Sequence, residues 1–256
     1  MASIIKRSIG RIFNLLGYNL VKRSGDEIIF PIDMEDSVRD IIRSVKPFTM
    51  TSIERIYGLI KSVDYITSNE IEGDIVECGV WQGGSMMSVA QRLCQKKSVK
   101  RGLWLYDTFE GMPAPTSLDY SKRSGDARSK FNKTTTDGEF SDWCNADIAT
   151  VRHNLGTTSY PEDKIKYIKG KVEDTIPGNL PEKIALLRLD TDWYESTKHE
   201  LIHLYPLLVF GGVIIIDDYG HWEGCRTAVD EFMETLEKPP LLNRLDYTGR
   251  IGVKLG

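Results

Sequence analysis

The stretch of sequence that decides the fold class is DIVECGVWQGGSMMSVAQRLCQK, residues 74–96. It begins with a short apolar run typical of a buried strand, passes through a glycine-containing turn, and ends in residues of helical composition and spacing. A strand, a turn and a helix in this order make up the first part of a βαβ unit. The stretch therefore predicts an α/β fold, with the glycine turn at the carboxyl end of a strand.

Further apolar runs alternate with helical patterns along the rest of the chain. Strands are predicted at 102–109, 164–172, 183–190 and 211–218, and helices at 194–208 and 225–236. This alternation predicts a doubly wound, mostly parallel sheet with helices on both faces. Residues 35–70 are expected to form two helices interrupted near Pro47, and residues 241–255 an antiparallel edge pair. Residues 111–150 show no clear period and are interpreted as a mobile active-site insertion.

Composition limits the classes of protein to which the chain can belong. Its 256 residues fit one large α/β domain. The 33 basic and 37 acidic side chains give a formal net charge of −4, and the basic residues are spread out, so no nucleic-acid partner is expected. The four cysteines, Cys78, Cys94, Cys144 and Cys225, show no close pairing. A reducing cytoplasm therefore fits better than a disulfide or zinc framework.

The N-terminal stretch is basic and amphipathic. In residues 3–23, SIIKRSIGRIFNLLGYNLVKR, apolar residues recur at helical spacing with lysines and arginines among and after them. One interpretation is a helix lying on an anionic membrane surface. The other is an arm or lid packed on the domain or on a second subunit of a homo-oligomer. No apolar run is long enough to span a bilayer. We predict an arm at 1–34 and a folded domain at 35–256.

The turn after the first strand is the expected ligand site, because ligands of open α/β sheets bind beyond the carboxyl ends of the strands. Gly79, Gly83 and Gly84 allow a close approach of the backbone to a ligand, although any tight strand-to-helix turn needs glycine. Asp107, at the end of the second strand, is placed to accept hydrogen bonds from a ribose. Glu77 would repel a pyrophosphate but suit a cationic cofactor. With no GxGxxG spacing, the pattern favours S-adenosylmethionine over NAD.

Two apolar runs end in pairs of aspartates. In LLRLDTDWYES, residues 186–196, the apolar run ends at Asp190 and Asp192. In GGVIIIDDYG, residues 211–220, it ends at Asp217 and Asp218. If these strands are neighbours, the carboxylates converge and repel one another unless a cation compensates. Magnesium prefers such oxygen ligands. The alternative, in which Asp192 caps the following helix and the second pair lies in a loop, explains one pair more easily than two.

Four strings resemble the macrocin O-methyltransferase family: GDIVECGVWQGGS, LYDTFEGMP, ALLRLDTDWYEST and GGVIIIDDYGHWEGCRTAVDEF. The resemblance runs from about residue 47 to 235 and keeps the family's motif order. It implies a Rossmann-like class I methyltransferase fold and a magnesium-dependent transfer of a methyl group from S-adenosylmethionine to a hydroxyl, typically on a sugar. It also implies metal ligands at Asp190, Asp217 and Asp218 and a general base at Asp192.

The resemblance further implies which residues surround the cofactor. These are Glu77, Gly79, Trp81, Gly83, Gly84 and Ser85 in the loop, Asp107, Thr108 and Phe109 at the ribose, Thr49 and Met50 in a covering segment, and Val172 and Glu173 at the adenine. Val172 stands where members often carry an aromatic residue, so adenine packing is expected to differ. His221, beside the second acidic pair, ranks behind Asp192 as a base.

The acceptor is expected to be a small molecule or glycan, most simply a sugar of a natural product or a surface glycan, with a small phenol as the alternative. Two other functions compete with methyl transfer. A nicotinamide-dependent oxidoreductase is disfavoured by the missing GxGxxG and by Glu77. A non-catalytic cofactor-binding module is disfavoured by the four aspartates, because a pocket used only for binding has no need of a metal and a base.

Overall fold

The computed structural model describes residues 28–135 and 138–255. Residues Met34–Gly256 form one compact unit. The amphipathic arm predicted from residues 3–23 lies outside the described residues, so its contact with a membrane or a second subunit stays a prediction. No helix in the described part of the chain is long and apolar enough to cross a membrane.

A seven-stranded sheet in the order β10-β11-β9-β8-β1-β2-β7 forms the centre of the unit. Its parallel strands are β1 (Asp74–Cys78), β2 (Leu103–Asp107), β7 (Ile165–Lys169), β8 (Ile184–Leu189) and β9 (Leu208–Ile216). The chain runs from β1 outward through β2 to β7 and then returns to the other side of β1 with β8. The strand order therefore reverses at β1, and the carboxyl end of β1 is where ligands of such sheets bind.

The C-terminal residues complete one edge of the sheet. β10 (Asn243–Arg244) and β11 (Arg250–Val253) pair antiparallel with each other, and β11 pairs antiparallel with β9. This confirms the antiparallel edge predicted at residues 241–255. The five predicted strands and the adjacency of β8 and β9 are also confirmed.

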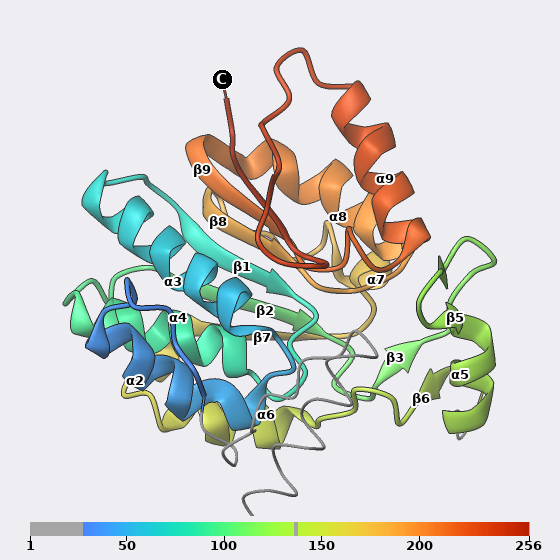
Figure 1. The fold of residues 1–256 in the computed structure, drawn as a ribbon, viewed down its shortest axis with the longest axis horizontal. Coiled ribbons are helices and arrows are strands. Elements are labelled where there is room, and N and C mark those ends of the chain that lie inside the picture. The colour runs from blue at the N-terminus through green and yellow to red at the C-terminus, as the bar shows by residue number, and fades with distance from the viewer. Residues whose placement is uncertain (1–27, 136–137, 256) are drawn as a thin grey trace, which may run out of the picture. The chain divides into compact units, whose positions relative to one another are not determined.

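Helices cover both faces of the sheet (Figure 1). On one side lie α2 (Asp36–Val45), α3 (Ile53–Ser68), α4 (Gly84–Gln95) and α6 (Ile148–Gly156), and on the other α7 (Val172–Thr175), α8 (Tyr194–Leu204) and α9 (Glu223–Glu234). The short 3₁₀ helix Lys46–Phe48 separates α2 from α3, because Pro47 cannot continue an α-helix. Two further 3₁₀ turns, Glu162–Lys164 and Tyr205–Leu207, precede β7 and β9.

The predicted insertion contains more regular structure than its sequence pattern suggests. Within residues 111–150 lie the strand pairs β3 (Met112–Pro113) with β6 (Phe140–Ser141) and β4 (Tyr120–Ser121) with β5 (Gly125–Asp126), and helix α5 (Ala127–Thr134) lies between β5 and β6. Asp126 caps α5 through its side chain, and Asp147 caps α6 in the same way. These elements are short and bury few side chains, so they leave no hydrophobic period in the sequence.

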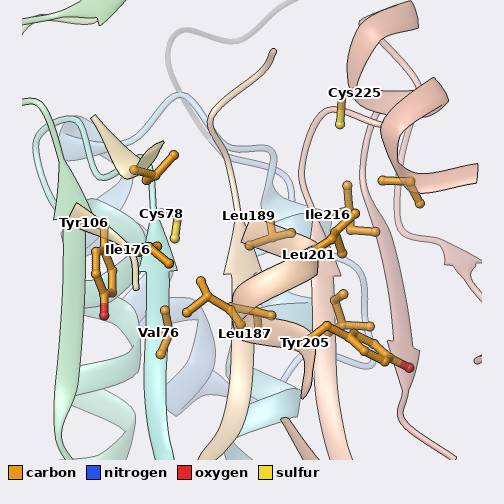
Figure 2. Close-up of a cluster of buried hydrophobic side chains, with 14 of the residues drawn as sticks. Val76, Cys78, Tyr106, Ile176, Leu187, Leu189, Leu201, Tyr205, Ile216 and Cys225 are labelled. Carbon is orange, nitrogen blue, oxygen red and sulfur yellow. The ribbon is translucent and has the colours of Figure 1, made fainter. Parts of the chain in front are cut away.

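One cluster of the core lies between the sheet and the α8–α9 layer (Figure 2), and α3 and α4 bury further side chains on the other face. All six residues of β8 are buried, and Leu187, Leu189 and Ile216 pack with Leu201 of α8. β-strands covered on both faces read as continuous apolar runs, which is why β8 and β9 were recognisable in the sequence. Arg188 is the charged exception in β8 and is buried like its neighbours.

Truncating this core tests the fold directly. We expect Leu187→Ala to lower the free energy of unfolding by about 2–5 kcal/mol, because Leu187 is fully buried and its loss leaves a cavity. The matched control is Leu241→Ala, since Leu241 is 78% exposed; its effect should stay within about 0.5 kcal/mol. Denaturant unfolding followed by circular dichroism measures both. Equal losses in the two variants would contradict the burial described above.

Candidate active site

A cavity of about 320 Å³ opens at the carboxyl ends of β1, β2, β8 and β9. Many of the residues singled out from the sequence line it: Thr49, Met50, Gly79, Trp81, Ser85, Asp107, Thr108, Val172, Glu173, Asp190, Asp192, Asp217, Asp218 and His221. Four others are not part of its lining, namely Glu77, Gly83, Gly84 and Phe109. The cavity thus joins the predicted cofactor loop to the predicted metal ligands.

Three aspartates converge at one end of this cavity. Asp190, Asp217 and Asp218 each offer a carboxylate oxygen, and these oxygens lie within 4.8 Å of one another. They meet because β8 and β9 are parallel neighbours with Leu189 opposite Ile216, so the residues after both strands leave the sheet side by side. The same edge of the sheet therefore receives both acidic pairs.

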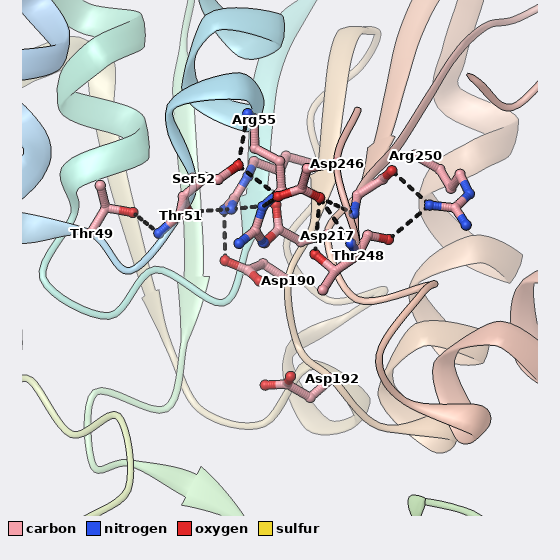
Figure 3. Close-up of polar contacts among 12 residues, drawn as sticks. Thr49, Thr51, Ser52, Arg55, Asp190, Asp192, Asp217, Asp246, Thr248 and Arg250 are labelled. Atoms are coloured by element: carbon pink, nitrogen blue, oxygen red, sulfur yellow. Dashed lines mark hydrogen bonds and ion pairs between the residues drawn. The ribbon is translucent and has the colours of Figure 1, made fainter. Parts of the chain in front are cut away.

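Two arginines that were not predicted from the sequence, Arg188 and Arg55, form ion pairs with this acidic cluster. Figure 3 shows Arg55 beside Asp190, Asp217 and Asp246. Arg188 donates from Nη1 to Glu77 Oε1 at 2.6 Å and approaches Asp190 Oδ2 at 2.8 Å, and its Nη2 donates to Asp217 Oδ1 at 2.7 Å. Arg55 of α3 donates to Asp217 and, from Nε, to Asp246 Oδ2 at 3.0 Å. The signal for Arg188 was a charged residue inside an apolar strand.

Glu77 acts on the cavity through Arg188 and does not line it. Its side chain is fully buried in β1, pairs with Arg188 and leaves Oε2 without a hydrogen-bond partner. Burial raises the pKa of Glu77 to about 7, although the guanidinium opposes that rise. The sequence argument placed this carboxylate opposite a cationic ligand; in the structure the cation beside it is Arg188.

The cluster carries more negative than positive charge. Four carboxylates, those of Glu77, Asp190, Asp217 and Asp246, form ion pairs with two guanidiniums, those of Arg55 and Arg188, and the carboxylates of Asp218 and Asp192 lie next to this network. Burial, followed by the repulsion of neighbouring carboxylates, raises the pKa values of Asp190 and Asp218 well above their usual range. Asp218 Oδ2 is also buried without a hydrogen-bond partner. An all-oxygen donor set with surplus negative charge fits a hard divalent cation.

Asp107 organises the turn after β1. Its Oδ2 accepts hydrogen bonds from the amides of Val80 at 2.6 Å and Trp81 at 3.1 Å, and its Oδ1 accepts one from Phe109 at 2.7 Å. Burial raises the pKa of Asp107, while these amides oppose the rise. The carboxylate that was predicted to meet a ribose therefore also shapes the loop around it.

Glycine is required in this turn for steric reasons. Gly79 has φ +81°, and a Cβ there would lie 2.0 Å from the carbonyl oxygen of Asp190. Gly83 has φ +88° where α4 begins, and a Cβ on Gly84 would lie 2.5 Å from the carbonyl oxygen of Phe48. Gly83 and Gly84 therefore serve the approach of α4 to neighbouring chain segments, whereas Gly79 lets the β1 and β8 loops touch.

Asp192 stands apart from the ionic network in Figure 3. It adopts a left-handed backbone with φ +67°, and its Oδ1 accepts a hydrogen bond from Trp222 Nε1 at 2.7 Å. Burial and then the charge of Asp190 raise the pKa of Asp192 to about 7. The alternative that Asp192 caps the next helix is wrong, because Trp193 is the N-cap residue of α8 and the first amide of that helix, on Tyr194, donates to Asp119 Oδ1 at 2.8 Å.

His221 lies at the cavity beside Trp222, with its Nε2 3.1 Å from Ser124 Oγ of the insertion. Burial lowers the pKa of His221, and the positive charges of Arg123, Lys130 and Arg55 lower it further. The histidine is therefore mainly neutral near pH 7, which keeps it available as a hydrogen-bonding partner.

The relationship to known proteins agrees with this geometry. A profile of the macrocin O-methyltransferase family matches residues 30–251. This chain belongs to that family. It is 30% identical over 201 residues to demethyldecarbamoylnovobiocin O-methyltransferase of Streptomyces niveus, covering 78% of this chain and 73% of the relative.

The chain is also similar to a second O-methyltransferase in sequence and to a solved O-methyltransferase in fold. It is 31% identical over 201 residues to 8-demethyl-8-(2,3-dimethoxy-alpha-L-rhamnosyl)-tetracenomycin-C 4'-O-methyltransferase of Streptomyces olivaceus, with 78% of this chain and 73% of the relative covered. Its fold matches the solved O-methyltransferase NovP with a TM-score of 0.71 at 28% identity, covering 82% of this chain and 83% of that one. The predicted class I methyltransferase fold is confirmed, and this macrocin O-methyltransferase family member is an O-methyltransferase.

The buried arginine yields a stability prediction. We expect Arg188→Gln to lower the free energy of unfolding by about 3–5 kcal/mol near neutral pH, because it leaves buried carboxylates without their partner. The loss should be smaller at pH 5 than at pH 8. In the wild type, Glu77 keeps its proton in the folded state at low pH and ionises as the pH rises through about 7, where Arg188 stabilises its charge; the variant lacks that stabilisation, so its loss grows over the same range.

Denaturant unfolding of Arg188→Gln at several pH values measures this effect. Lys183→Gln is the control, since Lys183 pairs with Glu72 at 2.7 Å on the surface, where ion pairs contribute little. A loss from Arg188→Gln no greater than that of the control, or one that shrinks as the pH rises, would contradict the prediction.

Proposed function

We propose that this protein transfers the methyl group of S-adenosylmethionine to a sugar hydroxyl, with magnesium held by Asp190, Asp217 and Asp218. The observation that carries the proposal is the acidic triad at one end of a cavity whose other walls come from the glycine turn and Asp107. The rhamnosyl group in the name of the tetracenomycin relative supports a sugar acceptor.

The cofactor is proposed to lie along the β1 and β2 ends of the cavity. Asp107 stands at the end of β2 for the ribose, while Val172 and Glu173, at the start of α7, border the same cavity for the adenine. Val172 offers only an aliphatic surface, as expected from the sequence. Met50 is 61% exposed and lines the cavity mouth, where it can cover a bound nucleoside.

The chain's own residues then align the reaction and remove a proton. The acceptor oxygen must approach the methyl carbon in line with the bond to sulfur, and enclosure by the insertion and the triad restricts that approach. Magnesium, when bound, supplies Lewis acidity that lowers the pKa of a hydroxyl. Asp192 lies beside the triad but is not one of the proposed magnesium ligands. It accepts the hydroxyl proton as the oxygen–carbon bond forms and the methyl–sulfur bond breaks, which releases S-adenosylhomocysteine.

Cofactor choice is the first test of the proposal. Calorimetric titration of the full chain should show binding of S-adenosylmethionine and none of NAD, because the turn amides of Val80 and Trp81 donate to Asp107 and are not left for a pyrophosphate. Asp107→Ala should weaken that binding by about tenfold or more, since the carboxylate serves both the ribose and the loop. Asp163→Ala, on a 3₁₀ turn away from the cavity lining, is the control. NAD binding without S-adenosylmethionine binding would overturn the proposed function.

Metal ligand and base are separated by a second pair of variants. Asp218→Asn should weaken Mn²⁺ binding, measured by water-proton relaxation, and lose turnover that raised magnesium partly restores by mass action. Asp218 is preferred over Asp217 because Asp217 also binds both arginines. Asp192→Asn should bind Mn²⁺ normally yet lose about a hundredfold or more of turnover at every magnesium concentration.

Turnover in this test is followed as S-adenosylhomocysteine release, with sugar-bearing antibiotics as acceptors and a simple phenol for comparison. The wild-type rate should fall as the pH drops, because Asp192 must lose its proton to act as a base; burial raises its pKa to about 7, and magnesium beside Asp190 would move the acidic limb below that value. Asp218→Asn should keep this acidic limb. If Asp192→Asn retains near-full turnover, the base assignment is wrong and His221 is the next residue to test.

A further inference from the structure

Trp222 connects the two loops that carry the proposed base and the proposed metal ligands. Its backbone amide donates a hydrogen bond to the carbonyl oxygen of Asp218 at 3.1 Å, within the loop that follows β9. Its indole Nε1 donates to Asp192 Oδ1 at 2.7 Å, in the loop that follows β8. One residue thus sets the position of the carboxylate of Asp192 relative to Asp218.

The indole of Trp222 is held firmly enough to direct this hydrogen bond. It is 4% exposed and meets the ring of Trp193 edge-on, with centroids 5.2 Å apart at 70°. Trp143 of the insertion contacts it at 6.1 Å and 61°, and His221 at 4.7 Å and 88°. Three rings around one buried ring restrict its rotation, because close-packed side chains cannot reorient without displacing neighbours.

The backbone of Asp192 is fixed from the other side. Its left-handed φ of +67° is uncommon for a residue other than glycine. The flanking residues maintain it, since the amide of Trp193 donates to the carbonyl oxygen of Thr191 at 2.8 Å and the Thr191 hydroxyl donates to Glu200 Oε1 at 3.0 Å. With its backbone set by this turn, the carboxylate of Asp192 is oriented by the indole donor.

We infer that Trp222 is a positioning residue that holds Asp192 for proton transfer and keeps it in register with the metal-binding loop. The indole donates to Oδ1 and so fixes the direction in which the carboxylate of Asp192 presents its remaining lone pairs to the acceptor's proton. A base needs its accepting atom within hydrogen-bond reach of the reacting hydroxyl, and small displacements of positioning groups are costly in rate. The inference rests on the proposed role of Asp192 as the base.

The chain contains a matched control for this interaction. Trp104 of β2 donates its indole Nε1 to Asp74 Oδ2 at 2.8 Å and is 7% exposed. The contact has the same chemistry and similar burial, but Asp74 is the first residue of β1, at the end of the strand away from the cavity. If kcat falls merely because a buried indole–carboxylate hydrogen bond is lost, the Trp222 and Trp104 variants should lose kcat alike. If Trp222 positions the base, only the Trp222 variant should lose kcat.

Two measurements on the full chain test the inference. The first is kinetic: Trp222→Phe should lower kcat about tenfold or more while the dissociation constants for S-adenosylmethionine and Mn²⁺ stay within about twofold, and Trp104→Phe should keep the wild-type kcat. The second is spectroscopic. The chain has five tryptophans, so ¹⁵N-tryptophan labelling gives five indole signals. Asp192→Asn should shift the signal that Trp222→Phe removes, and Asp74→Asn the signal that Trp104→Phe removes.

The outcomes separate this inference from the proposed function. If Asp192→Asn is inactive but Trp222→Phe matches Trp104→Phe in kcat, or raises only the KM for the acceptor, the positioning role is overturned while the base assignment stands. If Asp192→Asn remains active, the base assignment itself fails. Should Trp222→Phe not fold, Trp222→His, which keeps a ring N–H donor, assigns the signal. An indole signal that ignores Asp192→Asn then overturns the inference.

Discussion

The guanidinium of Arg188 is the constraint on which the rest of the site depends. It is buried near the carboxyl end of β8 and binds carboxylates from three different segments, namely Glu77 of β1, Asp190 after β8 and Asp217 after β9. Buried charges are tolerated only when they are paired and hydrogen-bonded. Arg188 therefore ties the carboxyl ends of three adjacent strands together, and Arg55 extends this network to α3 and, through Asp246, to the C-terminal hairpin.

The same network keeps the acidic triad available for a ligand. Without the two arginines, the convergence of so many carboxylates would favour their protonation and weaken them as cation ligands. With them, part of the charge is compensated by the protein and part is left over, as the unpartnered Asp218 Oδ2 shows. Neighbouring carboxylates thus have different roles. Glu77 only supports the structure by pairing with Arg188, whereas the triad faces the cavity.

The insertion supplies one wall of the cavity. Residues of 111–150 supply Trp143, which packs on Trp193 and Trp222, and Ser124, whose hydroxyl meets His221. Lys130 of the same segment places its Nζ 3.6 Å from the centroid of the Trp143 ring. The wall beside Asp192 is therefore aromatic and bordered by positive charge, whereas the triad end is acidic. The proposed acceptor site lies between these two surfaces of different chemistry.

Patterns in the sequence were enough to predict the order of strands and helices along the chain, the glycine turn and the convergence of Asp190, Asp217 and Asp218. It could do so because these features follow from local periodicity and from the rule that parallel strands end at one edge. Glu77 shows the limit of such reasoning, since its position before the turn was predicted but its partner, 111 residues away, was not. Three other features became visible only in the folded protein. They are the hydrogen bond between Trp222 and Asp192, the helix within the insertion, and the ion pair by which Arg55 offsets the charge of Asp217. Side-chain partners distant in sequence depend on how strands are ordered and how helices pack over them, and a one-dimensional pattern of apolar and polar residues carries no record of that pairing.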